Sequence, residues 1–182
     1  MPEVQVRPAT STDLPLLASL DHSYSTDYVW QMETRQADGG GEAVLVTFRS
    51  VRLPRSVRVN PPRDAHGLAE AWNRRVCFLV AEEGGHLKGY LNLTLAAVPG
   101  TGWIADLGVE RRFRRMGVAS VLLAAALQWA RANHLQRVVL ETQSKNFPAI
   151  SFAQKHGLVY CGYNDRYYPN QDVALFFGAN LK

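Results

Sequence analysis

Alternating apolar and polar side chains predict a series of short strands along this 182-residue chain. The pattern has a period of two at the N-terminus, between residues 43 and 53, and in three consecutive segments that follow residue 75. Gly84-Gly85 separates the first two of those three segments as a hairpin turn would. The strands we predict are 4–7, 43–53, 76–82, 87–96, 102–109, 137–142, 158–163 and 173–177.

Apolar residues recur at helical spacing between these strands. Thr10 to Thr12 offer N-caps for a helix that continues to Leu20, and a short helix is expected over 64–72 after a basic, proline-punctuated connection. Longer helices are predicted over 117–133 and over 146–156, the second ended by Gly157. Residues 23–33 stay open between a short helix and a loop, and the glycines at 39–41 break the chain.

Apart from the strand at 43–53 and the short helix over 64–72, the order of elements is βαβββαβαββ, which indicates an α/β (α+β) protein with a mixed sheet covered by helices. No linker divides the chain, so residues 1–182 are expected to form a single domain. A composition of 47% hydrophobic and 20% charged residues is typical of a globular protein.

Composition also narrows the cellular setting. The chain shows no secretory signal, and its most apolar helical run, residues 118–126, is too short to span a bilayer. Cys77 and Cys161 lack the paired spacing of metal ligands, so two reduced thiols and no metal are expected. We therefore expect a cytoplasmic protein without a membrane partner.

The strongest chemical signal lies between a predicted strand and a predicted helix. The strand ends at Asp106-Leu107-Gly108-Val109, four arginines (Arg111, Arg112, Arg114, Arg115) fall within five residues, and Met116-Gly117-Val118-Ala119 begins the helix. A helix start offers unpaired N–H groups and partial positive charge, and Gly117 and Ala119 leave room for an anion such as pyrophosphate. The alternative is a solvated basic loop before an ordinary helix.

The spacing favours the anion site. Val109, Arg114, Gly117 and Ala119 match V-x-x-x-x-R/Q-x-x-G-x-G/A. Further along, Asn146, Ala149 and Phe152, followed by Gly157-Leu158, match N-x-x-A-x-x-[FLY]-x(4)-G-F with Leu158 in place of the last residue. The two motifs, in this order and between the expected strands, resemble the GNAT superfamily of N-acetyltransferases.

The resemblance implies a GNAT fold, a mixed and mostly antiparallel sheet with a splayed central pair of strands, and an acetyl-CoA cosubstrate. The strand with Leu107 and Val109 would part from the strand with Leu140 and Glu141, and the pantetheine arm would lie in the gap. Asn146 would bind that arm, cap the following helix, or do both. The backbone amides expected to hold the pyrophosphate are those of Arg114, Arg115, Met116, Gly117, Val118 and Ala119.

The resemblance also implies the reaction, direct attack of a primary amine on the thioester through a tetrahedral intermediate. The amide of Leu107 would stabilise the oxyanion. Since only a neutral amine attacks, a base is needed, and Glu141 is the first candidate, with a strand-end salt bridge as its alternative. Asp106 is a weaker candidate. Many relatives have a tyrosine as the acid where this chain has Ala153. Candidate replacements are Tyr160, Tyr163, Tyr167 and Tyr168, with Tyr168 preferred, and a tyrosine at 153 is expected to be tolerated.

Two subfamilies compete for the acceptor. Residues 20–30, the strand at 43–53 and Leu140 to Gln143 resemble streptothricin-type acetyltransferases, which points to a small-molecule, antibiotic-like amine. Against this, Arg55, Arg58 and Arg63 would repel a cationic substrate. Residues 166–169 followed by 172–175 instead resemble ribosomal-protein alanine N-acetyltransferases, which acetylate a peptide amine.

Two other classes of function compete with the enzyme. A non-catalytic acyl-CoA-binding regulator would keep the loop from Arg114 to Ala119 and lose the proton-handling groups, which Ala153 fits. A nucleic-acid partner is not expected, since the arginines flank a tight helix start and not a long helix face. A homodimer is neither indicated nor excluded.

Overall fold

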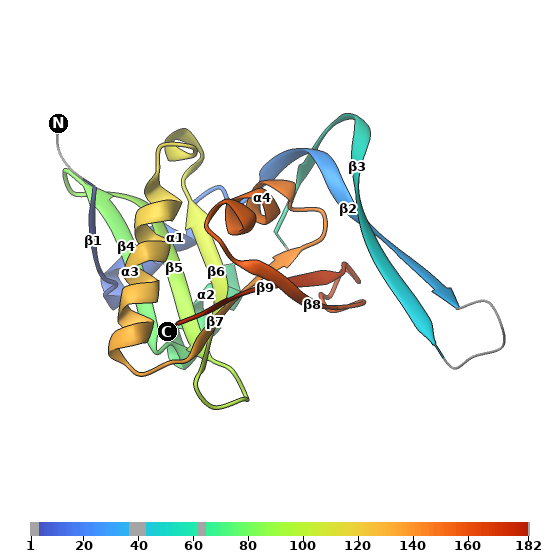
Figure 1. The fold of residues 1–182 in the computed structure, drawn as a ribbon. Coiled ribbons are helices and arrows are strands. Elements are labelled where there is room, and N and C mark those ends of the chain that lie inside the picture. The colour runs from blue at the N-terminus through green and yellow to red at the C-terminus, as the bar shows by residue number, and fades with distance from the viewer. Residues whose placement is uncertain (1–3, 37–42, 62–64, 182) are drawn as a thin grey trace.

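A seven-stranded sheet forms the centre of the protein, seen in a computed structural model that describes residues 4–36, 43–61 and 65–181 (Figure 1). Its strand order is β1-β4-β5-β6-β7-β9-β8, and of these neighbouring pairs only β6 and β7 run parallel. The strands are β1 (Gln5–Pro8), β4 (Cys77–Glu83), β5 (His86–Leu95), β6 (Thr101–Val109), β7 (Arg137–Gln143), β8 (Val159–Asn164) and β9 (Ala174–Asn180). The mixed, mostly antiparallel sheet is confirmed.

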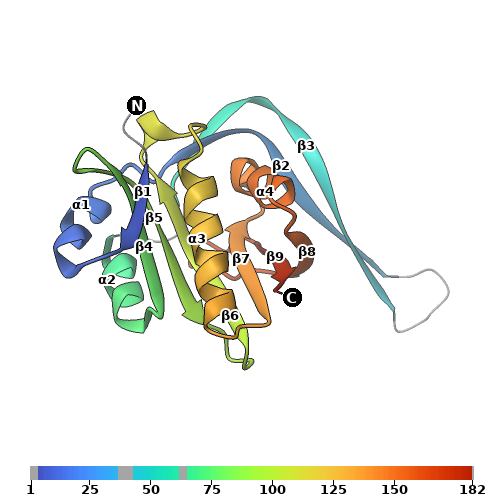
Figure 2. The same cartoon turned by 60° about the vertical axis from the view of Figure 1, so that its left-hand side comes forward.

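Helices cover both faces of this sheet (Figure 2). Helices α3 (Val118–Ala132) and α4 (Phe147–Lys155) pack on one face, where Leu122, Leu123 and Ile150 join the larger core. Helices α1 (Leu14–Ala18) and α2 (Ala65–Arg74) cover the other face of β4 and β5 over a smaller core. Two short 3₁₀ turns, at Ser11–Asp13 and Arg111–Phe113, precede α1 and α3. Within the described ranges, no helix has the length and apolar character to cross a membrane.

The alternation along β4 shows why this sheet needs cover on both faces. Leu79 and Ala81 point into the core under α3, whereas Phe78 and Val80 pack against α1 and α2. Five consecutive residues of this strand are buried. The sequence of such a strand is a continuous apolar run because both of its faces are buried.

The central strand pair is splayed, as expected. The pairing of β5 with β6 shifts by one residue, because Asn92 faces Asp106 whereas Leu93 faces Ile104, which leaves Ala105 as a bulge. A bulge bends its strand and increases the local twist. The register of β6 with β7 accordingly ends at Ile104 opposite Leu140, and the second half of β6 diverges from β7.

The most evident departure from the sequence prediction is a long two-stranded arm. Residues 23–33, expected to be a short helix or a loop, belong to strand β2 (Tyr24–Gln36), and the strand expected at 43–53 is the longer β3 (Val44–Val59). The two pair with each other in a separate antiparallel sheet and project from the body (Figure 1). We call this pair of strands the arm.

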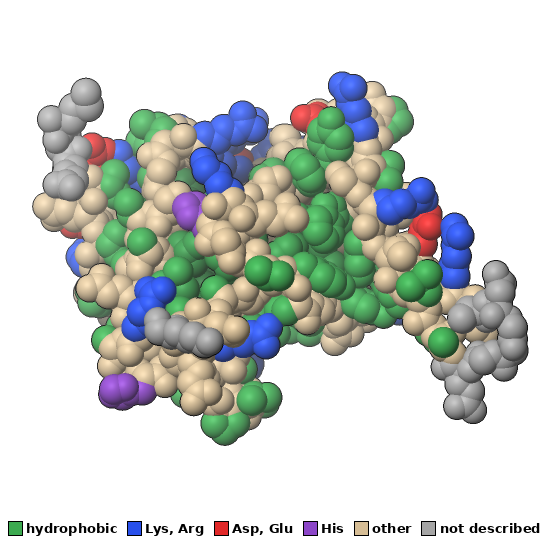
Figure 3. Space-filling model, in the orientation of Figure 1, with side chains coloured by type: hydrophobic (Ala, Val, Ile, Leu, Met, Phe, Trp, Pro, Cys, Tyr) green, Lys and Arg blue, Asp and Glu red, His purple; other side chains and the backbone are tan. Residues whose placement is uncertain are grey.

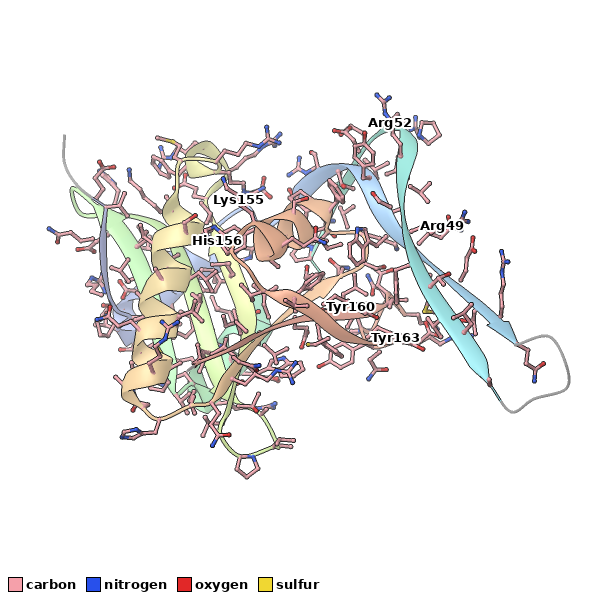
Figure 4. The ribbon with its side chains drawn as sticks, viewed as in Figure 1. Arg49, Arg52, Lys155, His156, Tyr160 and Tyr163 are labelled. Carbon is pink, nitrogen blue, oxygen red and sulfur yellow. The ribbon has the colours of Figure 1, made fainter. Side chains whose placement is uncertain are left out.

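Aromatic side chains attach the half of the arm nearest the body. The rings of Trp30 and Phe48 lie 6.4 Å apart, and both pack on Tyr160 of β8, at 6.2 and 5.8 Å. The backbone N–H of Trp30 also donates to the carbonyl of Ser144 at 2.9 Å. Figure 3 shows the hydrophobic band between the body and the arm, and Figure 4 shows Tyr160 and Tyr163 on β8 beside it. Since a lone two-stranded ribbon is marginally stable, these contacts hold the arm in place.

Parts of the sequence prediction fall at or beyond the limits of the described ranges. The helix expected over 64–72 is α2, described from Ala65 onward. Its expected first residue Asp64, the neighbouring Arg63 and the break at Gly39 to Gly41 lie outside the described residues.

Ala153 occupies a different environment from the one expected. It is 0% exposed and belongs to the core beneath α4, together with Ile150 and Leu158. The expectation that a tyrosine is tolerated here is therefore wrong, because a ring has no room in a packed interior.

We predict that Ala153→Tyr lowers the free energy of unfolding by about 2–3 kcal/mol, because the added ring overpacks the core. Urea denaturation measures the change. Gln154→Tyr, the same substitution at the exposed neighbour on α4, serves as the control and is expected to leave stability nearly unchanged. Equal stability of the two variants would contradict the placement of Ala153 in the core.

Candidate active site

One large cavity lies where β6 and β7 part. Its volume is about 840 Å³, and its wall is formed by the second half of β6, the end of β7, the starts of α3 and α4, and the beginning of β2. Its charged lining residues divide into two groups. Basic residues lie toward the start of α3 (Arg111, Arg114, Arg115), and acidic residues lie on β2, β6 and β7 (Asp27, Asp106, Glu141). The cavity thus offers one basic end and one acidic wall.

The basic end is built around the first turn of α3. Gly117 is the N-cap residue, and its φ of 87° lies in the left-handed region that favours glycine. Its carbonyl accepts from Ser120 and Val121 at 2.9 and 3.1 Å, which starts the helix. A Cβ at Gly117 would meet nothing within 4 Å, so the space in front of the helix start is open. This is the local geometry of an anion site.

A contact between the two helices steadies this helix start. Ser120 lines the cavity in the first turn of α3, and its Oγ lies 3.0 Å from Nε2 of His156 at the end of α4. His156 also packs on the ring of Phe152, with centroids 4.4 Å apart. The end of α4 thereby supports the first turn of α3.

The side chain of Arg114 makes three hydrogen bonds to backbone carbonyls. Its Nε donates to Val109 at 2.9 Å, Nη1 to Ser23 at 2.6 Å and Nη2 to Asp21 at 2.5 Å. Burial lowers its pKa, and Asp21 partly offsets that effect. The guanidinium therefore joins the loop before α3 to the segment before β2. Arg115, by contrast, is exposed, and its backbone φ is 63°.

The other residues predicted for the cosubstrate, with the exception of Met116, also line the cavity. Leu107 and Val109 lie on β6 beyond the last pairing with β7. Gly117, Val118 and Ala119 lie at the start of α3. Asn146 is the N-cap residue of α4, where its Oδ1 accepts from the N–H of Ala149 at 3.1 Å. Met116 is 66% exposed and does not appear among the lining residues.

Glu141 lies on the acidic wall and is 8% exposed. Two neutral donors bind the same carboxylate oxygen, Nε1 of Trp103 at 2.8 Å and the hydroxyl of Tyr167 at 3.0 Å. Trp103 is opposite Val139 in the parallel register of β6 and β7, so it shares a face with Glu141 two residues farther along. The carboxylate is therefore held in one orientation beside the cavity.

Tyrosines from two segments far apart in the chain line the cavity. Tyr168 is 6% exposed and lines the cavity, with its ring 5.1 Å from that of Tyr167. Tyr24, at the start of β2, donates its hydroxyl to Oε1 of Gln143 at 2.9 Å, and Nε2 of Gln143 donates to Asp172 at 2.8 Å. Burial raises the pKa of Tyr24, so its hydroxyl stays protonated. This chain of hydrogen bonds ties the arm to the ends of β7 and the β8–β9 connection.

His22 is a further titratable group in the cavity wall. Its ring lies 5.6 Å from that of Tyr90, and its Nε2 is buried without a hydrogen-bond partner. Burial lowers the pKa of His22, against a smaller raising effect of Asp106. Burial thus favours the neutral form of this imidazole.

Several of these residues escaped the sequence prediction. Trp103, His22 and Tyr24 were not proposed for the site, and Tyr167 was only one of several candidate tyrosines. An alternation of Tyr24, Thr26 and Tyr28 was the available signal for a strand beside the cavity. Among the residues described, no three His, Cys, Asp or Glu side chains come together as a metal site.

The mixed sheet, its splayed central pair of strands and the open helix start at one end of the gap are the features that the resemblance to the GNAT superfamily implied. The family model of the acetyltransferase (GNAT) family matches residues 47–158, which is more than half of the chain. The chain belongs to this family.

Individual relatives agree with this assignment. Streptothricin acetyltransferase A of Bacillus subtilis is 33% identical over 78 residues, a match that spans 41% of this chain and 45% of that protein's length. The solved structure of a provisionally named streptothricin acetyltransferase of Bacillus anthracis, in complex with acetyl coenzyme A, superposes with a TM-score of 0.78 at 21% identity and covers 99% of both chains. The ribosomal-protein-S18-alanine N-acetyltransferase of Escherichia coli gives 0.68 at 13% identity, covering 99% of this chain and 95% of that one.

We predict that Gly117→Glu weakens coenzyme A binding by about 100-fold or more, since a carboxylate would stand where the helix start favours an anion. Isothermal titration calorimetry measures the affinity. Gly157→Glu is the matched control, because Gly157 has a similar φ of 76°, has nothing within 4 Å of its Cβ position and lies away from the cavity. The assignment of the anion site to α3 fails if Gly117→Glu and Gly157→Glu bind coenzyme A equally well.

Proposed function

We propose that this protein, acting as one domain over residues 1–182, transfers the acetyl group of acetyl-CoA to a primary amine of a small molecule. One observation carries the proposal. A single cavity joins the open helix start at Gly117 to the gap between β6 and β7 and to the oriented carboxylate of Glu141. An anionic cosubstrate and an amine could thus meet in one place.

The residues around the helix start fit the diphosphate of acetyl-CoA. The positive φ and the open space at Gly117 let an anion approach the first amides of α3 closely. The amides of residues 114–119 would hold the diphosphate, and the carboxamide of Asn146 would lie beside the pantetheine arm while it caps α4. Beyond Ile104, the edge of β6 that faces β7 could pair with the amide groups of that arm.

Acetyl-CoA supplies an activated carbonyl, and the chain supplies the groups that handle protons and charge. The amide of Leu107, beyond the bulge, would donate to the carbonyl oxygen as negative charge develops there. Glu141 would accept the proton that an ammonium acceptor must lose before its nitrogen can attack, since an alkylamine has a pKa of about 10.4. The donors Trp103 and Tyr167 would fix the carboxylate toward the acceptor.

The departing thiolate needs little help. A thiol has a pKa of about 8.5, so its conjugate base is a tolerable leaving group at neutral pH. We assign Tyr168 as the hydroxyl that protonates it, because Tyr168 lines the cavity from the β8–β9 connection. Ala153, in the core under α4, does not line the cavity.

The arrangement of charges supports a small-molecule amine over the objection raised by Arg55, Arg58 and Arg63. Of these, Arg58 on β3 pairs with Asp21 at 3.0 Å, so its charge is balanced by a neighbour. Arg49, farther along the same strand, pairs with Glu33. The acidic residues described in the cavity wall, Asp27, Asp106 and Glu141, would favour a cationic acceptor. Repulsion of a cationic acceptor by β3 is thus smaller than the sequence suggested.

The test is a thiol-release assay with acetyl-CoA and a panel of acceptors. The panel contains streptothricin, simple polyamines, aminoglycosides and peptides with a free N-terminal alanine. Turnover of a small amine with a kcat/KM at least tenfold above that of any peptide is expected. Preference for the peptides would instead favour an N-terminal acetyltransferase, and coenzyme A binding without turnover of any acceptor would favour a non-catalytic acyl-CoA-binding regulator.

We further predict that Glu141→Gln lowers kcat by about 100-fold or more, the usual contribution of a general base, and leaves the affinity for coenzyme A within about twofold. Steady-state kinetics across pH and calorimetry measure the two effects. Glu70→Gln, the same change at an exposed carboxylate of α2, is the control. An unaltered pH–rate profile in Glu141→Gln would move the base to another residue.

A further inference from the structure

Arg114 stands out because its guanidinium, in the wall of the cavity, is bonded to backbone carbonyls at the end of β6 and in the segment before β2. Three of its donors serve backbone carbonyls, those of Val109, Ser23 and Asp21. We infer that Arg114 is a positioning residue that couples the cosubstrate loop before α3 to the acceptor wall at the start of β2. The inference rests on the proposed function and deepens it, since it assigns how the two halves of the cavity are held together.

The segment bound by Arg114 is a compact polar turn. The carboxylate of Asp21 accepts from the N–H and the hydroxyl of Ser23, at 3.0 and 2.6 Å. Arg58 of β3 binds the same two residues, at 3.0 Å to Asp21 and 2.9 Å to the hydroxyl of Ser23. Arg114 therefore meets a turn in which the side chains of Asp21 and Ser23 are already paired, and it binds the backbone carbonyls of these two residues.

The same turn carries the acceptor wall. His22 lies between the two carbonyls that Arg114 binds, and it lines the cavity. Tyr24 follows directly and is tied to Gln143 on β7. The next four residues of β2, 25–28, also line the cavity. A displacement of the turn would thus move the wall against which an amine acceptor must lie.

The other end of the connection is the anion site. The backbone of Arg114 is three residues before Gly117, and its Nε is bonded to the last residue of β6. A diphosphate bound at the start of α3 would restrict the backbone of residues 114–119. Through the guanidinium, the same restriction would reach residues 21–24, and by thermodynamic linkage an acceptor on that wall would favour the bound state of the loop.

Arginine is the side chain that this geometry needs. A planar guanidinium can donate in several fixed directions at once, whereas a lysine ammonium on a flexible stem is a point charge. Arg114→Lys would keep the positive charge but lose the simultaneous hydrogen bonds to the carbonyls of Val109, Ser23 and Asp21. This substitution separates coupling from plain electrostatic attraction of a phosphate.

Hydrogen exchange monitored by mass spectrometry tests the coupling without knowledge of the acceptor, with coenzyme A as the probe. In the wild-type protein, coenzyme A is expected to slow exchange at residues 114–121 and also at 21–28. In Arg114→Lys and Arg114→Gln, the slowing at 114–121 should remain and the slowing at 21–28 should disappear. Arg112→Gln is the control, since Arg112 is exposed, pairs with Glu110 and lies outside the cavity lining.

Two results would overturn the inference. One is wild-type behaviour of Arg114→Lys, which would reduce Arg114 to a source of charge. The other is the absence of any effect of coenzyme A at residues 21–28 of the wild-type protein when residues 114–121 respond. A wild-type protein that does not respond at 114–121 counts against the proposed function instead.

The apo proteins give an independent measure of the connection. Without coenzyme A, Arg114→Lys should exchange about tenfold faster than wild type at residues 21–28, as expected for the loss of hydrogen bonds to a charged group. Exchange in α3 and the melting temperature should stay close to those of the wild type. Equal apo exchange rates at 21–28 would also overturn the inference, whichever cosubstrate the protein uses.

Discussion

The separation of β6 from β7 after Ile104 is the constraint on which the rest of the site depends. Adjacent parallel strands normally satisfy each other's backbone groups, and the bulge at Ala105 ends that arrangement in the middle of the sheet. The gap exposes strand edges that a ligand with amide groups can use. It also places the helix start of α3 and the wall around Glu141 on either side of one cavity.

Different parts of the chain supply the two sides of that cavity. The side that we propose for the cosubstrate comes from β6, α3 and α4, whereas the side that we propose for the acceptor is formed largely by the segment before β2, by β2 itself and by the β8–β9 connection. Hydrogen bonds from Arg114 and from Tyr24 cross between these parts. The long-range polar contacts of the protein are thus concentrated at the place where two substrates would have to meet.

The sequence predicted the body of the protein well, because its strands and helices carry strong periodic signals. The strand before Arg111 and the helix after Gly117 were located to within one or two residues, and so was α4 between Asn146 and Gly157. The arm was missed in part, although Tyr24, Thr26 and Tyr28 alternate as strand residues do. An interpretation as helix or loop was natural, because the partner strand β3 lies across a segment of glycines and the pairing is not visible locally.

The site could be predicted only in part from the sequence, because contacts between distant segments are not visible locally. Motif spacing located the helix start and Asn146, but not Trp103, whose contact with Glu141 depends on the parallel register of two strands far apart in the chain. Motif matching also pointed to an arginine near phosphate without revealing that its guanidinium is bonded to three backbone carbonyls. Ala153 looked like a vacant catalytic position, yet its side chain faces the interior.

The attachment of the arm has a consequence for how such a protein can diversify. Only its near half is fastened to the body, through Trp30, Phe48 and the rings of β8, whereas Val44 and Leu45 farther out are 64% and 56% exposed. Substitutions along the outer half can accumulate without disturbing either core. Substitutions at residues 24–28, which line the cavity, would instead alter the wall that we propose for the amine and leave the start of α3 unchanged. On this proposal, new acceptors would evolve without a new cosubstrate site.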